Sequence, residues 1–254
     1  MTLELITIPC LADNYAFLLH AESGETALID APEAGPILAE LDARGWSLTH
    51  LFLTHHHWDH IDGVPGILEH HQPKVIGAAR DAHRLPALTE ALAPGDTTDF
   101  AGHRVEVMEA HGHTTGHIAF HIPDARMAFT GDSLMALGCG RLFEGSPADM
   151  WQSLSGFKAL PADTLICSGH EYTEANGRFA VTIEPDNAAL AQRNAETARA
   201  RQQGKATVPS LLSTELATNP FLRADLPEVK TALGMENAPD EKVFAEIRAR
   251  KDRF

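Results

Sequence analysis

The chain has 254 residues, is 44% hydrophobic and carries 35 acidic against 20 basic residues, which gives a formal net charge of −15. This length suffices for one large domain or for a domain with a smaller appendage. The charge argues against nucleic acid or an anionic membrane as a partner, because binding phosphate groups needs a basic face. An anionic substrate would have to meet a local basic patch that works against the overall field.

The three cysteines, Cys10, Cys139 and Cys167, form no C-x-x-C motif and are odd in number. This pattern argues against a disulfide scaffold and fits a reducing compartment. The start of the chain, MTLELITIPC, has no basic region typical of a signal peptide, and no stretch approaches the ~18 apolar residues of a membrane span. We therefore expect a cytoplasmic protein without a membrane partner.

Residues 1–172 alternate short apolar runs with loops rich in Gly, Asp and His. The runs that predict strands are LELITI, YAFLLH, TALID, HLFLT, KVIGA, HRVEVMEA, HIAFHI, RMAFT and DTLICS. Helices are predicted in EAGPILAELDARG, in DGVPGILEHH with Asp62 as N-cap, and in PADMWQSLSGFKAL with Pro147 in the first turn. Clusters of strands with helices between them indicate packed sheets with helices outside.

The composition changes near residues 173–180, where Ala, Arg and Gln become frequent and strand signals disappear. Helical spacing is found in PDNAALAQRNAETARARQQG, PEVKTALG and DEKVFAEIRARKDRF. We therefore predict one domain of strands and helices over residues 1–172 and a small α-helical domain over residues 173–254.

A cluster of histidines follows the predicted strand HLFLT, within the stretch LFLTHHHWDH. On an extended chain residues i and i+2 point the same way, so His55 and His57 can serve one ion while His56 points away. The chain must then turn for Asp59 and His60 to serve a second ion. A solvated His-rich loop is the alternative interpretation.

Three further candidate ligands, His113, Asp132 and His170, follow other predicted strands. The complete set has nitrogen and oxygen donors and no thiolate, which suits zinc, iron or manganese. Seven donors are too many for one tetrahedral ion, so two divalent ions are predicted. A shared carboxylate could bridge ions about 3.5–4 Å apart, although spacing alone does not identify which one.

The motifs THHHWDH, GHT, GDS and SGHEYT, in this order and spacing, resemble the metallo-β-lactamase superfamily. Within it, GCGRLFEG, GHEYT, NPFLR and the terminal R-x-x-K-D-x-F resemble the glyoxalase II (hydroxyacylglutathione hydrolase) family. The resemblance covers essentially the whole chain. It implies an α+β fold, the αββα sandwich of two mixed sheets flanked by helices, with a small helical glutathione-binding domain at the C-terminus.

The resemblance also implies roles for single residues. A first metal would bind to His55, His57 and His113, a second to Asp59, His60 and His170, and Asp132 would bridge them. The substrate would contact Arg141, Phe143, Tyr172, Asn176, Arg248 and Lys251. The family often has Lys at the position of Arg141. Phe143 stands where some members carry a tyrosine, and its ring has no hydroxyl group to form the hydrogen bond that this tyrosine implies.

The implied reaction is hydrolysis of the thioester S-D-lactoylglutathione to D-lactate and glutathione, the second step of methylglyoxal detoxification. Two metals, zinc first and iron or manganese otherwise, would hold a bridging hydroxide as nucleophile, with Asp59 and Asp132 as catalytic carboxylates. Asp30 is a candidate partner for a ligand imidazole. The last eleven residues carry a local charge of +2 that suits an anionic small molecule, and we expect a monomer.

Three alternatives to this reaction are considered. A mononuclear iron persulfide dioxygenase of the same fold would need only one His/His/Asp iron site, and a β-lactamase would need a signal peptide. A non-catalytic metal-binding protein would need no anion patch beside the ligands.

Overall fold

The structure, a computed structural model, describes residues 2–254. Its strands are β1 (Leu3–Cys10), β2 (Asn14–Ala21), β3 (Thr26–Ile29), β4 (Leu48–Phe52), β5 (Lys74–Ala78), β6 (Glu90–Leu92), β7 (Thr97–Phe100), β8 (His103–Glu109), β9 (Ile118–Ile122), β10 (Met127–Gly131), β11 (Leu134–Met135), β12 (Gly138–Cys139), β13 (Leu165–Ser168) and β14 (Ser210–Leu211). Its helices are α1 (Ala34–Arg44), α2 (Trp58–Ile61), α3 (Val64–His70), α4 (Pro147–Lys158), α5 (Thr173–Ile183), α6 (Ala188–Gln202), α7 (Leu212–Thr218), α8 (Pro227–Leu233) and α9 (Asp240–Arg253), with short 3-10 turns η1 (Ala79–Asp81) and η2 (Pro123–Ala125).

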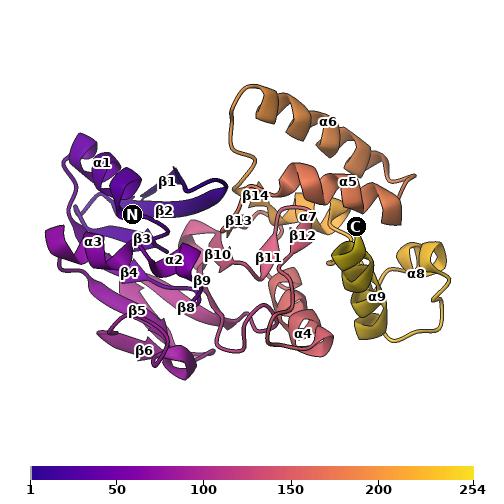
Figure 1. Cartoon of the computed structure of the whole chain (residues 1–254), viewed down its shortest axis with the longest axis horizontal. Helices are drawn as coiled ribbons and strands as arrows, with labels where there is room; N and C mark the ends of the chain where they lie inside the picture. The colour runs from indigo at the N-terminus through magenta and orange to yellow at the C-terminus, as the bar shows by residue number, and fades with distance from the viewer. Residues whose placement is uncertain (1) are drawn as a thin grey trace. The chain divides into compact units, whose positions relative to one another are not determined.

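Two six-stranded sheets organise these elements (Figure 1). The first has the order β1-β2-β3-β4-β5-β6, antiparallel from β1 to β3 and parallel from β3 to β6. The second has the order β14-β13-β10-β9-β8-β7, and β11 and β12 form a separate hairpin. The predicted architecture of two sheets flanked by helices is confirmed.

The chain divides into two compact units, and the first contains the residues up to Glu109 together with Gly116–Gly131. Within this unit, aromatic side chains of the two sheets interlock. The ring centroids of Phe52 and Phe120 are 5.0 Å apart, and those of Phe17 and Phe129 are 5.7 Å apart. All four side chains are buried, and burial of each contributes about 1.5–3 kcal/mol.

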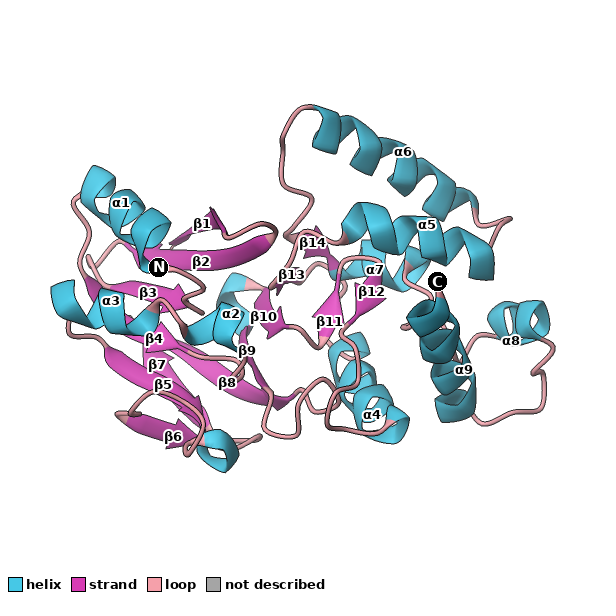
Figure 2. Ribbon diagram, viewed as in Figure 1, coloured by secondary structure: helices cyan, strands magenta, loops and turns pink. Residues whose placement is uncertain are grey.

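The second unit contains Ala110–Thr115 and Asp132–Phe254. Helices dominate it, as the cyan ribbons of Figure 2 show, with α5 packed on α6 and α4 on α9. Phe179, Phe221 and Phe244 are fully buried and form its aromatic core. The predicted boundary between residues 172 and 173 stays a prediction.

The structure also contains elements that were not predicted, among them the helices α5 and α7. Other local details differ as well. The N-cap of α3 is Gly63 rather than Asp62, because the short helix α2 intervenes and Asp62 caps its C-terminal end. Gly63 fits because a Cβ there would lie 2.8 Å from the carbonyl oxygen of Ala31. A strand, β14, also occurs in the region predicted to be purely helical, where it pairs with β13.

Helix α4 begins as its sequence predicts. Pro147 is in its first turn, and Ser146 and Asp149 form a reciprocal capping box before it. Across the described residues, no helix combines the length and apolar character that crossing a membrane requires.

Candidate metal site

The segment after β4 gathers histidine rings from an extended chain. The Nε2 atom of His55 lies 3.1 Å from Nδ1 of His57, and the ring centroids of His55 and His60 are 4.2 Å apart. His57 is the extended N-cap of α2, so the chain turns there and brings Asp59 and His60 into the first helical turn. His55 and His60 are fully buried.

Asp30, directly after β3, anchors this segment. It has a left-handed backbone (φ 56°), and its carboxylate accepts hydrogen bonds from the Thr54 amide and hydroxyl, both at 2.8 Å. Its Oδ2 atom also lies 2.8 Å from Nδ1 of His60. Because a carboxylate accepts, the proton of a neutral His60 sits on Nδ1 and the lone pair on Nε2 is left for a metal.

Asn14, at the start of β2, holds Asp59. Its side-chain amide donates to the Asp59 carbonyl oxygen at 3.0 Å and to carboxylate Oδ2 at 3.2 Å. These bonds fix the first turn of α2 and the direction of the carboxylate together. No sequence pattern pointed to Asn14, because the two residues are 45 positions apart.

The ring of His117 packs against the ring of His55. The two rings are stacked, with centroids 4.6 Å apart and planes inclined by 15°. A Cβ at Gly131 would lie 2.8 Å from Nε2 of His117 and 2.6 Å from the Thr54 hydroxyl. Gly131 therefore leaves the space in which His117 packs, and its φ of 48° also favours glycine.

The other three candidate ligands, His113, Asp132 and His170, all lie within the second unit. Oδ2 of Asp132 lies 3.5 Å from Nε2 of His113 and 3.3 Å from Nε2 of His170. Nδ1 of His113 donates to the Arg141 carbonyl oxygen at 2.8 Å, which places the lone pair of a neutral ring on Nε2. A Cβ at Gly140 would lie 2.0 Å from the Asp132 carbonyl oxygen, so only glycine allows this approach.

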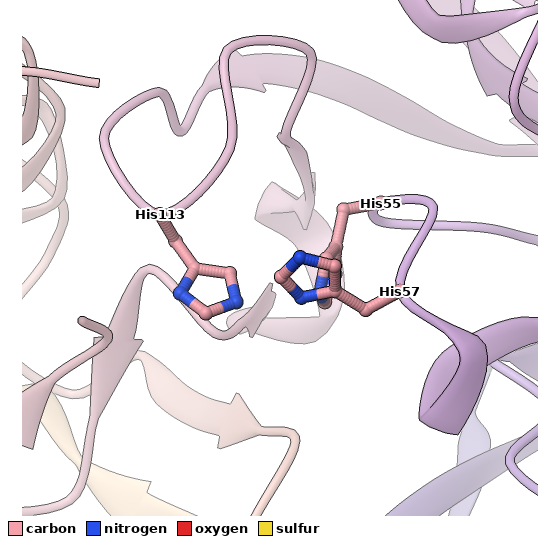
Figure 3. Close-up of side chains that lie close together, drawn as sticks. All are labelled: His55, His57 and His113. Carbon is pink, nitrogen blue, oxygen red and sulfur yellow. The ribbon is translucent and has the colours of Figure 1, made fainter. Parts of the chain in front are cut away.

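Three groups of side chains bring possible ligand atoms within 4.8 Å of one another. The first is His55, His57 and His113, drawn in Figure 3 with their imidazole rings close together. The others are Asp59, His60 and His170, and His55, His60 and Asp132. Asp132 thus shares a group with one histidine of each of the other two groups.

The donor set fits divalent metal ions. It consists of imidazole nitrogens and carboxylate oxygens without a thiolate, as in catalytic sites for zinc, iron or manganese. Buried carboxylates and histidines packed this tightly are also the arrangement that a cation compensates.

The predicted basic residues of α9 lie in a hydrogen-bonded cluster. Arg248 is buried, donates to the Cys139 carbonyl oxygen at 3.0 Å and pairs with Asp252 at 2.8 Å. Asp252 also lies 3.7 Å from the exposed Arg141.

The Lys251 ammonium donates to the Ala175 carbonyl oxygen at 3.3 Å. Burial lowers the pKa of Lys251 to about 8, with further lowering by the Arg248 charge.

The remaining predicted substrate residues differ in exposure. Phe143 is 60% exposed and contacts the ring of His113, whereas Tyr172 stacks on His170 with centroids 4.7 Å apart. Asn176 is buried, and its amide donates to the Ala136 carbonyl oxygen at 3.0 Å. The structure thus places Asn176 under the β11–β12 hairpin.

Solved structures share this fold. A crystal structure of ETHE1 from Myxococcus xanthus aligns over the whole of both chains with a TM-score of 0.66 and 22% identity. A crystal structure of the BLEG-1 B3 metallo-beta-lactamase covers 86% of this chain and 99% of its own, with a TM-score of 0.67 and 18% identity. At these sequence identities the comparison shows a shared fold and says nothing about a shared activity.

Sequence comparison is more specific. The metallo-beta-lactamase superfamily matches residues 13–170, and the hydroxyacylglutathione hydrolase C-terminus matches residues 171–254. A hydroxyacylglutathione hydrolase of Ruegeria pomeroyi is 61% identical over the full length of both chains. One of Rhizobium meliloti is 51% identical over 99% of each. With both halves matched and the ligand groups in place, the chain belongs to the hydroxyacylglutathione hydrolases of the metallo-beta-lactamase superfamily.

Proposed function

We propose that the protein hydrolyses the thioester bond of S-D-lactoylglutathione, releasing D-lactate and glutathione in the second step of methylglyoxal detoxification. The main observation behind this proposal is the three groups of possible metal ligands in a chain of this family. Its relatives are named for hydrolysis of hydroxyacylglutathione, and the match spans the full chain.

Two divalent ions, zinc first and iron or manganese otherwise, are the proposed cofactors. We assign the first to His55, His57 and His113 and the second to Asp59, His60 and His170, with Asp132 shared. When bound, such ions polarise a carbonyl group and lower the pKa of water to roughly 7.

The chain's own groups then orient the reactants. Asp59, held by Asn14, directs a water molecule toward the thioester carbonyl carbon. Asp132 keeps His113 and His170 turned toward a common point. The leaving thiol has an ordinary pKa near 8.5, so it departs as a thiolate without a strong general acid.

Glutathione carries two carboxylates and one ammonium group, so its thioester is an anion. We assign its recognition to Arg141 and Arg248, which pair with Asp252, and to Lys251, which interacts electrostatically with both Arg248 and Asp252. Tyr172 and Phe143 offer exposed rings next to two ligand histidines, and Asn176 supports the adjoining hairpin. This cationic cluster is the local patch that a chain of net charge −15 needs.

The direct test is incubation of the purified, metal-loaded protein with S-D-lactoylglutathione while the absorbance of the thioester is followed. We expect turnover with release of one free thiol for each thioester lost. If protein that carries two metal ions per chain does not turn over this thioester, the proposed function is wrong. Oxygen uptake on glutathione persulfide, with one iron per chain, would instead identify the dioxygenase.

The shared carboxylate offers a second test. Asp132→Ala removes a ligand common to both metals, so we expect a lower metal content and loss of turnover. Elemental analysis of protein purified beside the wild type measures the first effect. Wild-type content of both metals in this variant would show that Asp132 does not bridge.

We also propose that the protein works in the cytoplasm, as a monomer. Three buried thiols, Cys10, Cys139 and Cys167, are free in the structure, in keeping with a reducing compartment. Burial raises the pKa of Cys10 to about 12 and that of Cys139 to about 11.

A further inference from the structure

His56, the middle histidine of the triplet, belongs to none of the three ligand groups and has an acidic partner. Its Nδ1 atom lies 3.0 Å from Oδ2 of Asp81, a residue of η1 that is 25 positions away. Successive side chains of an extended segment point to opposite sides. Fixing His56 on one side therefore constrains His55 and His57 to turn toward the other.

The carboxylate of Asp81 is itself held firmly. The side chain is 1% exposed, and Arg84 donates to Oδ1 from Nε at 3.2 Å and from Nη2 at 2.6 Å. One oxygen thus binds the arginine and the other faces the histidine. A buried carboxylate with charge-assisted bonds to each oxygen has a single orientation.

Gly116 packs directly against this carboxylate. A Cβ at position 116 would lie 2.0 Å from Cγ of Asp81 and 2.2 and 2.3 Å from its oxygens. The φ of Gly116 is not positive, so it is the lack of space that requires glycine here. The next residue, His117, stacks on His55. Asp81 therefore contacts the chain on both sides of that stack.

We propose that Asp81 is a positioning residue for the first metal, and that it acts through His56 on the directions of His55 and His57. It offers no ligand itself. Instead it joins the ligand segment, η1 and the turn at Gly116 into one rigid support. This inference rests on the proposed metal-dependent function and names an acid that the motif H-x-H-x-D-H does not contain.

The test compares zinc retention in full-length, zinc-loaded variants exposed to increasing concentrations of EDTA. Loss of an outer partner of a metal ligand weakens metal affinity by about 10- to 100-fold. We expect a shift of that size toward easier zinc loss for His56→Leu, which cannot bond Asp81. For His56→Asn we expect retention within about threefold of wild type, because the Asn amide donates from nearly the position of Nδ1.

His121→Leu is the matched control. His121 is another buried histidine whose Nδ1 faces a carboxylate, 3.1 Å from Oε2 of Glu106, and it is outside the ligand groups. This substitution lowers stability without touching the support of His55 and His57. Zinc loss that is eased in His56→Leu but unchanged in His121→Leu supports the proposal.

Two results would overturn it: wild-type zinc retention in His56→Leu, or equally eased loss in both leucine variants. If His56→Leu does not fold, Gly116→Ala decides, because its methyl group displaces the Asp81 carboxylate. Unchanged zinc retention in folded Gly116→Ala also rules the proposal out. Wild-type protein that retains zinc but cleaves no thioester would remove the proposed function, while the zinc comparison would still decide the role of Asp81.

Discussion

Asp30 combines an unusual backbone with three hydrogen bonds at the metal site. Its left-handed conformation is one that asparagine tolerates, so Asp30→Asn keeps the backbone and removes the charge. One amide oxygen cannot satisfy both Thr54 donors and His60. We expect a loss of about 10- to 100-fold in metal affinity, because the His60 imidazole loses its orienting partner.

Metal content after equilibration at limiting zinc measures this effect. Asp124→Asn, at a side chain that is 71% exposed, is the control and should bind zinc as the wild type does. Equal zinc affinity of Asp30→Asn and wild type would show that Asp30 serves only the backbone.

Lys251 predicts a pH dependence of substrate binding. Its pKa is about 8 in the free protein, lowered from 10.5 chiefly by burial. Below pH 8 the side chain is a cation and attracts the glutathione carboxylates, and above pH 8 the charge is lost. KM should therefore rise as the pH increases from 7 to 9, while kcat changes less.

Steady-state kinetics across that range, with Lys251→Met beside the wild type, test the assignment. The variant should have a raised KM that no longer increases with a midpoint near pH 8. A parallel pH dependence of KM in both proteins would assign the effect to another group.

The grouping of the candidate ligands and the contact of Asp30 with a ligand-type imidazole, that of His60, could be predicted from the sequence, whereas the partners of Asp59 and His56 could not. His55, His57, Asp59 and His60 lie in one stretch, and their types alone indicate a metal. The hydrogen bonds of Asn14 to Asp59 and of His56 to Asp81 join residues 45 and 25 positions apart. Such pairs arise from strand order, which a single sequence does not reveal.

At the scale of elements, the β11–β12 hairpin connects Asp132 to the helical region. Glu215 of α7, fully buried, accepts from the Leu137 amide at 2.9 Å and pairs with Arg193 of α6. Asn219 donates to the carbonyl oxygens of Met135 and Gly138, both at 3.0 Å. Polar side chains of the helices thus satisfy the backbone of the hairpin turn.

Glu215→Ala should lower the free energy of unfolding by about 3–5 kcal/mol, because it leaves Arg193 as a buried charge without its carboxylate. Urea denaturation of the zinc-loaded protein measures this change. Arg250→Ala breaks a partly exposed pair with Glu246 and should cost no more than about 0.5 kcal/mol. If the two substitutions lowered the free energy of unfolding equally, the buried Glu215–Arg193 pair would not stabilise the protein more than the exposed pair does.

Strong hydrophobic periodicity predicted most elements, whereas the 11-residue helix α5 and several short or polar elements were not predicted. The runs LELITI and HIAFHI are strands, and DEKVFAEIRARKDRF forms α9. In contrast, β7 has the sequence TTDF and β14 only two residues. These two strands form because each pairs with a neighbouring strand, β7 with β8 and β14 with β13. Such pairing depends on residues distant in the sequence, so the local sequence does not predict it.

At the scale of the whole molecule, bound metal should contribute to stability. Metal binds the folded chain and not the dispersed ligands of the unfolded chain. A free metal concentration of about 1,000 times Kd should therefore raise the free energy of unfolding by about 4 kcal/mol. For a chain of this size, removal by a chelator should lower Tm on the order of 10 °C. Thermal denaturation with EDTA, then with zinc restored, measures this shift. An unchanged Tm after verified metal loss would contradict it.

The buried thiols have a consequence for an enzyme that releases glutathione. Disulfide exchange and reaction with electrophiles both need the thiolate form. With a pKa of about 11, Cys139 is ionised to about one part in ten thousand at pH 7, and Cys10 less. Oxidised glutathione therefore finds almost no thiolate on these two cysteines, and we expect both to resist mixed-disulfide formation with it.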